Sequence, residues 1–390
     1  MKTQSITQTV SGKSIIYILA LGVFGIITTE FGVIGILPQL ASHFDVSITQ
    51  AGWLLSAFAL TIAVFGPFVT LAASGINRKV ALSVVLGVFI ISNLISAVAP
   101  NFTILMIARI LPAFFHPIFF SVAMATAAQS VKPSEAPKTV SIVFSGVSIG
   151  TVLGVPFAVY FADLFDWHAA FIVCSVVNLV ALLFLLKFLP STPVKNKMSY
   201  GSQLGILKNT KTIWSIIITV LIITGMSASY GYMAQYLKEE IYMDGQTISL
   251  MMLLFGLAGV AGNLVVGRLL SKNLKRTVLS FLAALIIVQV LLSLFTYNFM
   301  AASVLIVIWG FIHTGGFLLG QTLITNSAPK AAEFASSIFV SAGNLGFAIG
   351  PILGGAALEV SGTVILPMVS IVILAFAALA FIIQNKFYGK

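Results

Sequence analysis

Charged side chains are scarce in this sequence, at 8% of 390 residues, whereas a typical soluble domain has about 25%. Hydrophobic residues make up 59% of the chain, and 31 residues are phenylalanine. So few charges cannot cover folded domains of this size with a polar surface. The composition therefore excludes a soluble enzyme and a nucleic-acid-binding protein, and it indicates a protein whose surface lies in lipid.

Cysteine and histidine are also rare. The single cysteine, Cys174, excludes an intramolecular disulfide and a thiolate metal cluster. The four histidines are scattered and do not form clusters with carboxylate or thiolate residues, so the sequence shows no metal-binding pattern. The stretch Gly12-Lys13-Ser14 is not a phosphate-binding loop, because that motif needs a glycine where this chain has Thr7. We therefore expect no metal, no cofactor and no coupling to ATP.

Long apolar runs are what the sequence has in abundance. A helix needs about 20 residues to cross the hydrocarbon core of a bilayer. Twelve runs reach roughly that length, at 15–37, 51–73, 80–98, 103–127, 140–161, 169–186, 213–236, 248–266, 278–295, 301–322, 335–358 and 365–383. The runs are continuous, unlike the alternating pattern of barrel strands, and the first is too long for a signal-peptide core. The sequence predicts an all-α integral membrane protein with twelve transmembrane helices.

Basic residues gather on one side of the predicted helices. With the N-terminus in the cytoplasm, every lysine and arginine except Arg109 and Lys238 lies at a cytoplasmic helix end or loop, and most acidic residues lie on the other side. Lysine and arginine accumulate in cytoplasmic loops, so both termini are predicted to be cytoplasmic in a multi-pass protein of a bacterial cell membrane. This topology and anionic lipid headgroups explain the net charge of +10 without nucleic acid as a partner.

The chain divides into two similar halves. Residues 1–187 form the predicted first six-helix bundle, 188–212 a basic cytoplasmic central loop, and 213–390 the second bundle. When the second half is laid on the first, Gly346 and Gly350 fall on Gly150 and Gly154, and a shift of one further residue places His313 on His116. A parallel repeat of six helices is typical of secondary transporters, whose substrate sites lie between the halves near the middle of the membrane.

Several stretches resemble one transporter family. They are Thr28-Thr29-Glu30-Phe31 and Gly35-Ile36-Leu37-Pro38 in the first predicted helix, Arg109 and His116-Pro117 in the fourth, and Ala342-Gly343-Asn344-Leu345-Gly346 in the eleventh. Over essentially its whole length the chain resembles the major facilitator superfamily, in its twelve-helix proton-coupled efflux branch, with the bacterial sugar, arabinose and purine efflux group as the nearest match. The resemblance implies transport by alternating access rather than catalysis, a small-molecule substrate and protons as partners, and a functional monomer.

Glu30 and Arg109 are the only full charges inside the predicted helices. At 1.5 Å per residue each lies roughly 10 Å below the outer helix ends, so equal depth permits them to pair. One interpretation is a neutralised ion pair that packs the first helix against the fourth. The other is a proton-coupling site, in which Glu30 alternates between a proton and Arg109 or a cationic substrate. Both roles can coexist.

Five further side chains are candidates for substrate binding. His116 and His313 lie near the middle of the bilayer on opposite halves, where an imidazole can bind a ligand, relay a proton or join two helices by a hydrogen bond. Tyr230 and Tyr232 lie in the outer part of the seventh predicted helix and either line a cavity or belong to the interfacial aromatic belt. Asn344 is an amide in an apolar run, which serves either as a ligand contact or as a helix contact.

Two predicted helices carry glycines at intervals of four, with prolines beside them. These residues are Gly146, Gly150, Gly154 and Pro156 in the fifth helix and Gly346, Gly350 and Pro351 in the eleventh. Such spacing places glycines on one helix face and lets backbones approach closely. The family resemblance implies a conformational role as well, although the fuller Gly-Pro-x-x-Gly-Gly form lies here in the eleventh helix rather than the fifth.

Three classes of function remain open. The first is a proton-coupled antiporter that exports a small organic solute, such as a sugar, a nucleoside or purine, or a drug-like compound. The second is a facilitative carrier or importer of a sugar or nucleoside. The third is a membrane enzyme or receptor that transports nothing. The resemblance favours the first class, so no enzymatic activity is expected.

Overall fold

The computed structural model describes residues 12–131, 136–191, 208–295, 297–328 and 332–388. Within these ranges every regular element is a helix. Twelve helical spans are long and apolar enough to cross a membrane, which confirms the all-α fold with twelve transmembrane helices. Most of the predicted central loop, including Pro193, Lys195 and Lys197, lies outside the described residues, so the boundaries of the two bundles stay a prediction.

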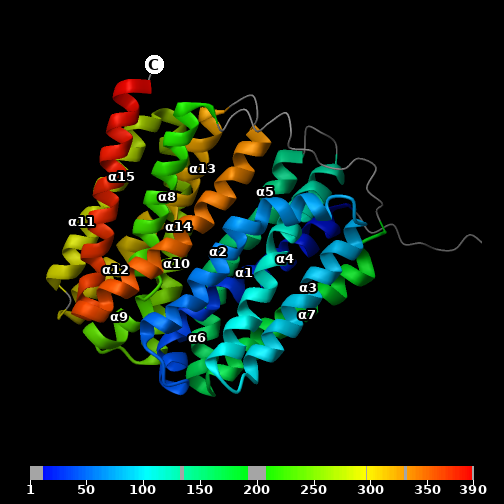
Figure 1. The fold of residues 1–390 in the computed structure, drawn as a ribbon, viewed down its shortest axis with the longest axis horizontal. Coiled ribbons are helices and arrows are strands. Elements are labelled where there is room, and N and C mark those ends of the chain that lie inside the picture. Colours follow the sequence, from blue (N-terminus) through cyan, green and yellow to red (C-terminus); the bar gives the residue numbers. More distant parts are fainter. Residues whose placement is uncertain (1–11, 132–135, 192–207, 296, 329–331, 389–390) are drawn as a thin grey trace, which may run out of the picture.

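The first half contains the first six spans (Figure 1). Its elements are α1 (Gly12–His43), α2 (Ile48–Ala73), α3 (Arg78–Ala97), α4 (Phe102–Gln129), α5 (Ala136–Ile149), the π-helix η1 (Gly150–Gly154), α6 (Val155–Leu164) and α7 (Trp167–Phe188). The fifth span therefore consists of α5 and α6, joined by one wide turn at the glycines. A π-helical turn inside a span is a frequent feature of functional regions.

The second half repeats this plan with two different interruptions. Its elements are α8 (Thr210–Tyr230), α9 (Met233–Glu240), α10 (Gly245–Lys272), α11 (Leu274–Phe295), α12 (Phe299–His313), α13 (Gly315–Ser327), α14 (Ala332–Ser361), the 3-10 turn η4 (Thr363–Ile365) and α15 (Leu366–Tyr388). The seventh span is interrupted at Gly231 and Tyr232, and the tenth at Thr314.

Short polar side chains start many of these helices. Ser47 forms a capping box with Gln50 at the start of α2, and Asn101 accepts a hydrogen bond from the backbone N–H of Ile104 in α4. Asp244 starts α10 and accepts from the backbone N–H of Thr247. Its hydrogen bonds with Thr247 hold the pKa of the Asp244 carboxyl below its usual value. These caps satisfy N–H groups that the helices themselves leave unpaired.

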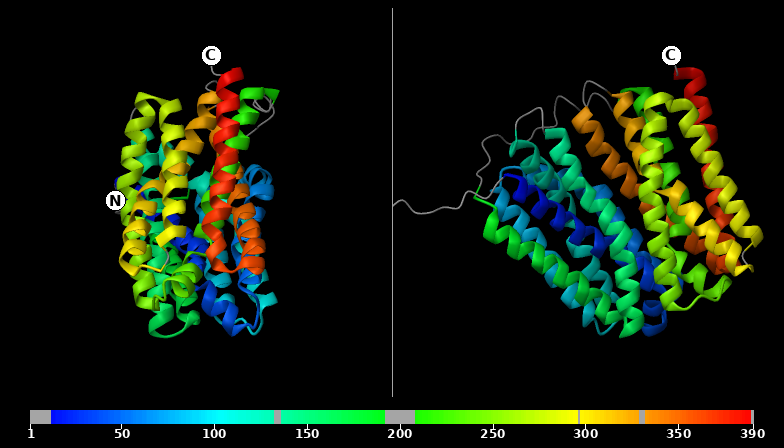
Figure 2. Two further views of the ribbon diagram at one scale, coloured as in Figure 1. Left: turned by 90° about the vertical axis from the view of Figure 1, so that its left-hand side faces the viewer. Right: turned by 180° about the vertical axis from the view of Figure 1, so that it is seen from behind.

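The two halves lie side by side and lean apart toward one end of the molecule (Figures 1 and 2). We call this the open end; it carries the last described residue of α15 and the first of α1. The opposite end, called the closed end, carries the turns at 44–47, 241–244 and 362. There α14 packs against α2, and α10 packs against α6. One buried apolar cluster extends through both halves, whereas a second belongs to the first half alone.

Hydrogen bonds join the halves at the closed end. Thr49 Oγ1 in α2 donates to the carbonyl oxygen of Gly355 in α14, at 2.9 Å. Ser249 Oγ in α10 donates to the carbonyl oxygen of Pro156 in α6, also at 2.9 Å. Each bond links one half to the other, so both must break before the halves can separate at this end.

The glycines predicted to allow close packing do so in both halves. Gly146, Gly150 and Gly154 face α1, and Gly346 and Gly350 face α8. A Cβ atom at Gly154 would lie 2.9 Å from the Cα atom of Thr28, and one at Gly346 would lie 2.9 Å from the carbonyl oxygen of Val220. Only glycine permits these backbone approaches. The conformational role of these residues stays a prediction.

Candidate substrate and proton site

A cavity of about 230 Å³ lies between the halves. Its wall is formed by α1, α4, α5 and η1 from the first half, and by α8, α10, α12, α13 and α14 from the second. Five residues predicted from the sequence reach it, namely Glu30, His116, Tyr230, His313 and Asn344. The structure thus brings together side chains from distant parts of the sequence at the interface of the repeats.

Glu30 and His116 form a buried pair at the wall of this cavity. Nε2 of His116 in α4 lies 3.1 Å from Oε2 of Glu30 in α1, within ion-pair distance, although the angle is not that of a hydrogen bond. Glu30 is 9% exposed and His116 is 5% exposed. The ring of Phe120 stacks on His116, with 4.6 Å between the ring centroids. A carboxylate attracts a protonated imidazole at this distance, so the two side chains interact directly.

Arg109 differs from the expected ion pair with Glu30. Its Nη2 atom donates to the carbonyl oxygen of Glu30 at 3.0 Å, and its Nη1 atom donates to the carbonyl oxygen of Thr29. The guanidinium also stands over the ring of Phe58, with 5.0 Å to the centroid. Within the described parts of the chain, no carboxylate lies at ion-pair distance from Arg109. Arg109 and Glu30 are close, as their equal depth in the membrane suggested, but the Glu30 carboxylate points to His116 and not to the guanidinium.

A polar network behind Glu30 holds this part of α1 in place. Nδ2 of Asn93 in α3 and Nδ2 of Asn178 in α7 each donate to Oγ1 of Thr29, at 3.0 Å in both cases. Oγ1 of Thr29 in turn donates to the carbonyl oxygen of Gly25 at 3.0 Å. Together with Arg109, these side chains tie α1 to three neighbouring helices at the residue before Glu30. Asn93 and Asn178 were not predicted as site residues. Each is a single amide in an apolar run, and that pattern could have indicated a buried hydrogen bond.

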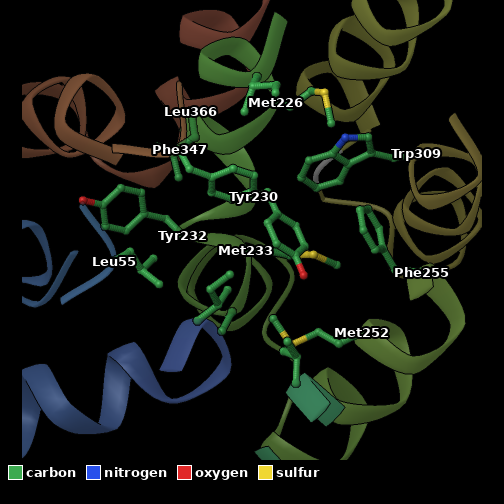
Figure 3. Packing of buried hydrophobic residues seen from close by; sticks show 14 of the residues in the cluster. Leu55, Met226, Tyr230, Tyr232, Met233, Met252, Phe255, Trp309, Phe347 and Leu366 are labelled. Carbon is green, nitrogen blue, oxygen red and sulfur yellow. The ribbon is translucent and has the colours of Figure 1, made fainter. Parts of the chain in front are cut away.

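The second half contributes an aromatic cluster around His313, and Figure 3 shows three of its members, Tyr230, Phe255 and Trp309. The centroid of Tyr230 lies 5.1 Å from that of His313 and 5.3 Å from that of Phe255, on which it stacks. Trp309 meets Phe255 edge-on at 5.2 Å. His313 is 2% exposed, and its Nδ1 atom has no hydrogen-bond partner among the described residues. Phe255 was not expected here, because nothing in an apolar run distinguishes a cavity phenylalanine from a lipid-facing one.

Tyr232 lies outside the cavity, which corrects its predicted place in the substrate site. Its hydroxyl donates to the carbonyl oxygen of Pro351 at 2.9 Å, and its ring packs against Gly52 of α2 at the closed end. The interruption of the helix at Gly231 turns Tyr232 away from Tyr230, as Figure 3 shows. The sequence placed the two tyrosines on one continuous helix, which concealed this change of direction.

Amide side chains line the part of the cavity formed by the second half. Asn344 is exposed to the cavity, and its Nδ2 atom donates to the carbonyl oxygen of Val340 in the same helix at 2.9 Å. Asn263 and Gln321 also line the wall, and Oδ1 of Asn263 is buried without a partner in the described structure. In the residues that the structure describes, no group of three or more His, Cys, Asp or Glu side chains is arranged to hold a metal ion. The wall therefore combines amide side chains with a carboxyl group, two imidazoles and several aromatic rings.

Comparison with protein families supports this interpretation of the fold. The family model described as "Major Facilitator Superfamily" matches residues 19–332 and, in a second match, 215–387. An uncharacterised MFS-type transporter, YfhI of Bacillus subtilis (strain 168), is 32% identical over 353 residues, which are 90% of this chain and 89% of YfhI. The inner membrane transport protein YdhP of Escherichia coli (strain K12) is 29% identical and covers 93% of each chain. A sugar efflux transporter of Helicobacter pylori (strain P12), named as probable, is 27% identical over 89% of each chain.

Solved structures share the same fold. A mutant of the nucleoside transporter NupG superposes with a TM-score of 0.77, covering 97% of this chain and 99% of that one at 14% identity. A bacterial homologue of the human lysosomal transporter Spinster, in an inward-facing unoccupied conformation, superposes with a TM-score of 0.75 at 14% identity over 96% of each chain. The protein is thus a multi-pass membrane transporter of a small solute and not an enzyme. The chain belongs to the major facilitator superfamily.

Proposed function

We propose that the protein is a proton-coupled antiporter that exports a small organic solute by alternating access. The observation that carries this proposal is the pair of Glu30 and His116, which is buried at 3.1 Å in the wall of the cavity between the halves. An ionisable group inside a membrane is costly and rarely present without a function. When a proton and a solute compete for one such group, movement of one drives movement of the other.

The sidedness of the molecule supports export. The basic residues of the described helix ends and turns, such as Arg78, Lys79, Lys187 and Lys275, lie at the end that carries the termini. By the positive-inside rule that end faces the cytoplasm of a bacterial cell, so the cavity opens inward and the closed end faces outward. In this state a cytoplasmic solute can enter the cavity and meet Glu30. We propose that the protein works as a monomer, since one chain provides both halves of the site.

The glycine contacts and the closed-end hydrogen bonds support a rocking movement of the halves. Close packing of η1 on α1 and of α14 on α8 makes each half a stiff unit, whereas few polar contacts join the halves at the closed end. When Thr49 and Ser249 release their carbonyl partners, the cavity would open outward. A proton from outside would then reach the Glu30 carboxyl and promote release of the solute.

The experiment compares Glu30→Gln with Asp45→Asn, a matched change of an exposed acid at the closed end. Metabolites that accumulate in cells lacking the protein first identify a solute, which is then loaded into proteoliposomes. Gradient-driven transport by Glu30→Gln should fall roughly tenfold or more, while solute exchange without a gradient survives in part, and Asp45→Asn should behave as wild type. Unchanged transport by Glu30→Gln between about pH 6 and about pH 8 would reject the coupling role.

A facilitative carrier or importer of a sugar or nucleoside is the second candidate. Its substrate class is supported by the relatives whose names include a sugar, although those names describe efflux. For such a carrier, the same experiment would leave Glu30→Gln close to wild type in exchange, and dissipating the proton gradient would leave net transport unchanged.

A further inference from the structure

Aromatic and other apolar residues make up most of the cavity wall. Phenylalanine side chains from both halves line it, among them Phe31, Phe120, Phe255 and Phe347. Phe31 and Phe347 meet across the halves, with 5.3 Å between their ring centroids. A sugar needs a polar partner for each buried hydroxyl, because a buried hydroxyl without a hydrogen bond is unfavourable.

Two polar side chains of the wall already donate within their own helices. Oγ1 of Thr151 donates to the carbonyl oxygen of Val147 at 3.1 Å, and Nδ2 of Asn344 donates to that of Val340 at 2.9 Å. Oδ1 of Asn263 and Nδ1 of His313 have no partner among the described residues, but aromatic rings outnumber such free groups in the wall. This favours a ligand that is mainly apolar.

Glu30 is the one acidic side chain among the described residues that line the cavity, and no lysine or arginine of those residues reaches it, although the chain contains 20. The two histidines of the wall, His116 and His313, add a positive charge only when they are protonated. A bound anion would therefore find no permanent positive partner. A bound cation would find the Glu30 carboxylate and the faces of several aromatic rings, both of which attract positive charge.

We infer that the substrate is an amphipathic cation, with a flat aromatic group and one protonated or quaternary nitrogen. The geometry orients it: the nitrogen would lie at Glu30 in the first half, in the place that the His116 imidazole now takes at 3.1 Å. The aromatic group would lie toward the second half, where Tyr230 and Phe255 stack at 5.3 Å beside His313. This inference rests on the proposed function for the direction of transport, whereas the preference for positive charge belongs to the site itself.

Three naphthalene compounds that differ only in charge test the preference. They are 1-naphthylmethylammonium, the neutral 1-naphthylmethanol and the anion naphthalene-1-sulfonate, each competing with fluorescent ethidium for purified protein in lipid nanodiscs at neutral pH. Empty nanodiscs correct for partition of each compound into lipid. We expect the cation to bind about tenfold or more tightly than the alcohol, the anion to bind least, and arabinose and glucose to leave ethidium bound.

Two variants separate the charge from the ring surface. Glu30→Gln should weaken binding of the cation about tenfold and change binding of the alcohol about twofold or less, with Asp45→Asn as the unchanged control. Phe255→Leu should weaken the cation and the alcohol by a similar factor of about two to ten, because it removes a ring that both use. Thermal unfolding of each purified variant verifies that it is folded.

The inference is overturned if the alcohol or the anion binds as well as the cation, if Glu30→Gln leaves the order of affinities unchanged, or if a sugar displaces ethidium. The result is independent of the coupling test. A cation preference without gradient-driven transport would refute the proposed antiport and leave the substrate class in place. Gradient-driven transport of a sugar would support the antiport and refute the substrate class.

Discussion

The hydrogen bond from Thr49 to Gly355 offers a direct test of how the closed end is held. Thr49→Val keeps the shape of the side chain and removes the hydroxyl that donates at 2.9 Å from α2 to α14. A single neutral hydrogen bond contributes about 1 kcal/mol net. Because this bond exists only while the closed end is closed, its loss should raise the population of the outward-open state about fivefold.

The same helix provides a matched control. Oγ1 of Thr61 donates to the carbonyl oxygen of Ala57 at 2.7 Å, within α2 itself. Thr61→Val removes a bond that lies within α2 rather than between the halves, so it should leave the conformational equilibrium unchanged. Ser249→Ala, which removes the bond from α10 to Pro156 in α6, should act like Thr49→Val. The two effects should multiply to about 25-fold in the double variant, since the sites are separate.

Labelling of one cavity cysteine measures the effect. Asn344→Cys in a Cys174→Ser background places a single thiol in the cavity wall, and an impermeant thiol reagent is added outside intact cells. The labelling rate follows the outward-open population while that state is minor. Equal rates for Thr49→Val and Thr61→Val would refute the reasoning, and rapid labelling of the parent protein would show that the open end faces outward.

Three further predictions concern packing, the network around Glu30 and a helix cap. Gly154→Ala should lower thermal stability by about 1 to 3 kcal/mol, because the new Cβ meets the backbone of Thr28, whereas Gly87→Ala, with open space around it, should not destabilise the protein. Arg109→Lys keeps the charge but loses the planar pair of donors, so gradient-driven transport should fall about tenfold or more; normal transport would mean that charge alone suffices. Asp244→Ala should lower the unfolding temperature in detergent, by the same amount at about pH 7 and about pH 5. Because the folded-state pKa of Asp244 lies below the unfolded value of about 3.9, the capping contribution is complete above that pH and is lost only as the pH falls further; a loss already at about pH 5 would contradict it.

The number of transmembrane helices was predictable because a bilayer imposes a simple rule on the backbone. In the hydrocarbon core, backbone N–H and C=O groups find no water, so a long continuous apolar run pairs them within itself as a helix. Hydropathy therefore indicated the number of spans, and the internal repeat predicted a substrate site between the halves. The structure has a cavity there, lined by Glu30, His116 and His313, while their role in binding stays a prediction. The glycine spacing predicted close helix contacts, because a missing side chain permits the same approach whichever helix is opposite.

Which side chains meet within the site depended on the rotation and register of packed helices, which hydropathy does not encode. The Glu30 carboxylate lies against His116 because α1 and α4 face each other at that angle, while Arg109 reaches the backbone of α1 instead. Tyr232 lies outside the cavity because the chain turns at Gly231, a local break that could not be recognised within the predicted continuous helix. The sequence by itself determined that the chain spans a membrane and carries ionisable groups there. Only tertiary packing decided which of those groups share a cavity, because that depends on the orientation of each helix relative to its neighbours.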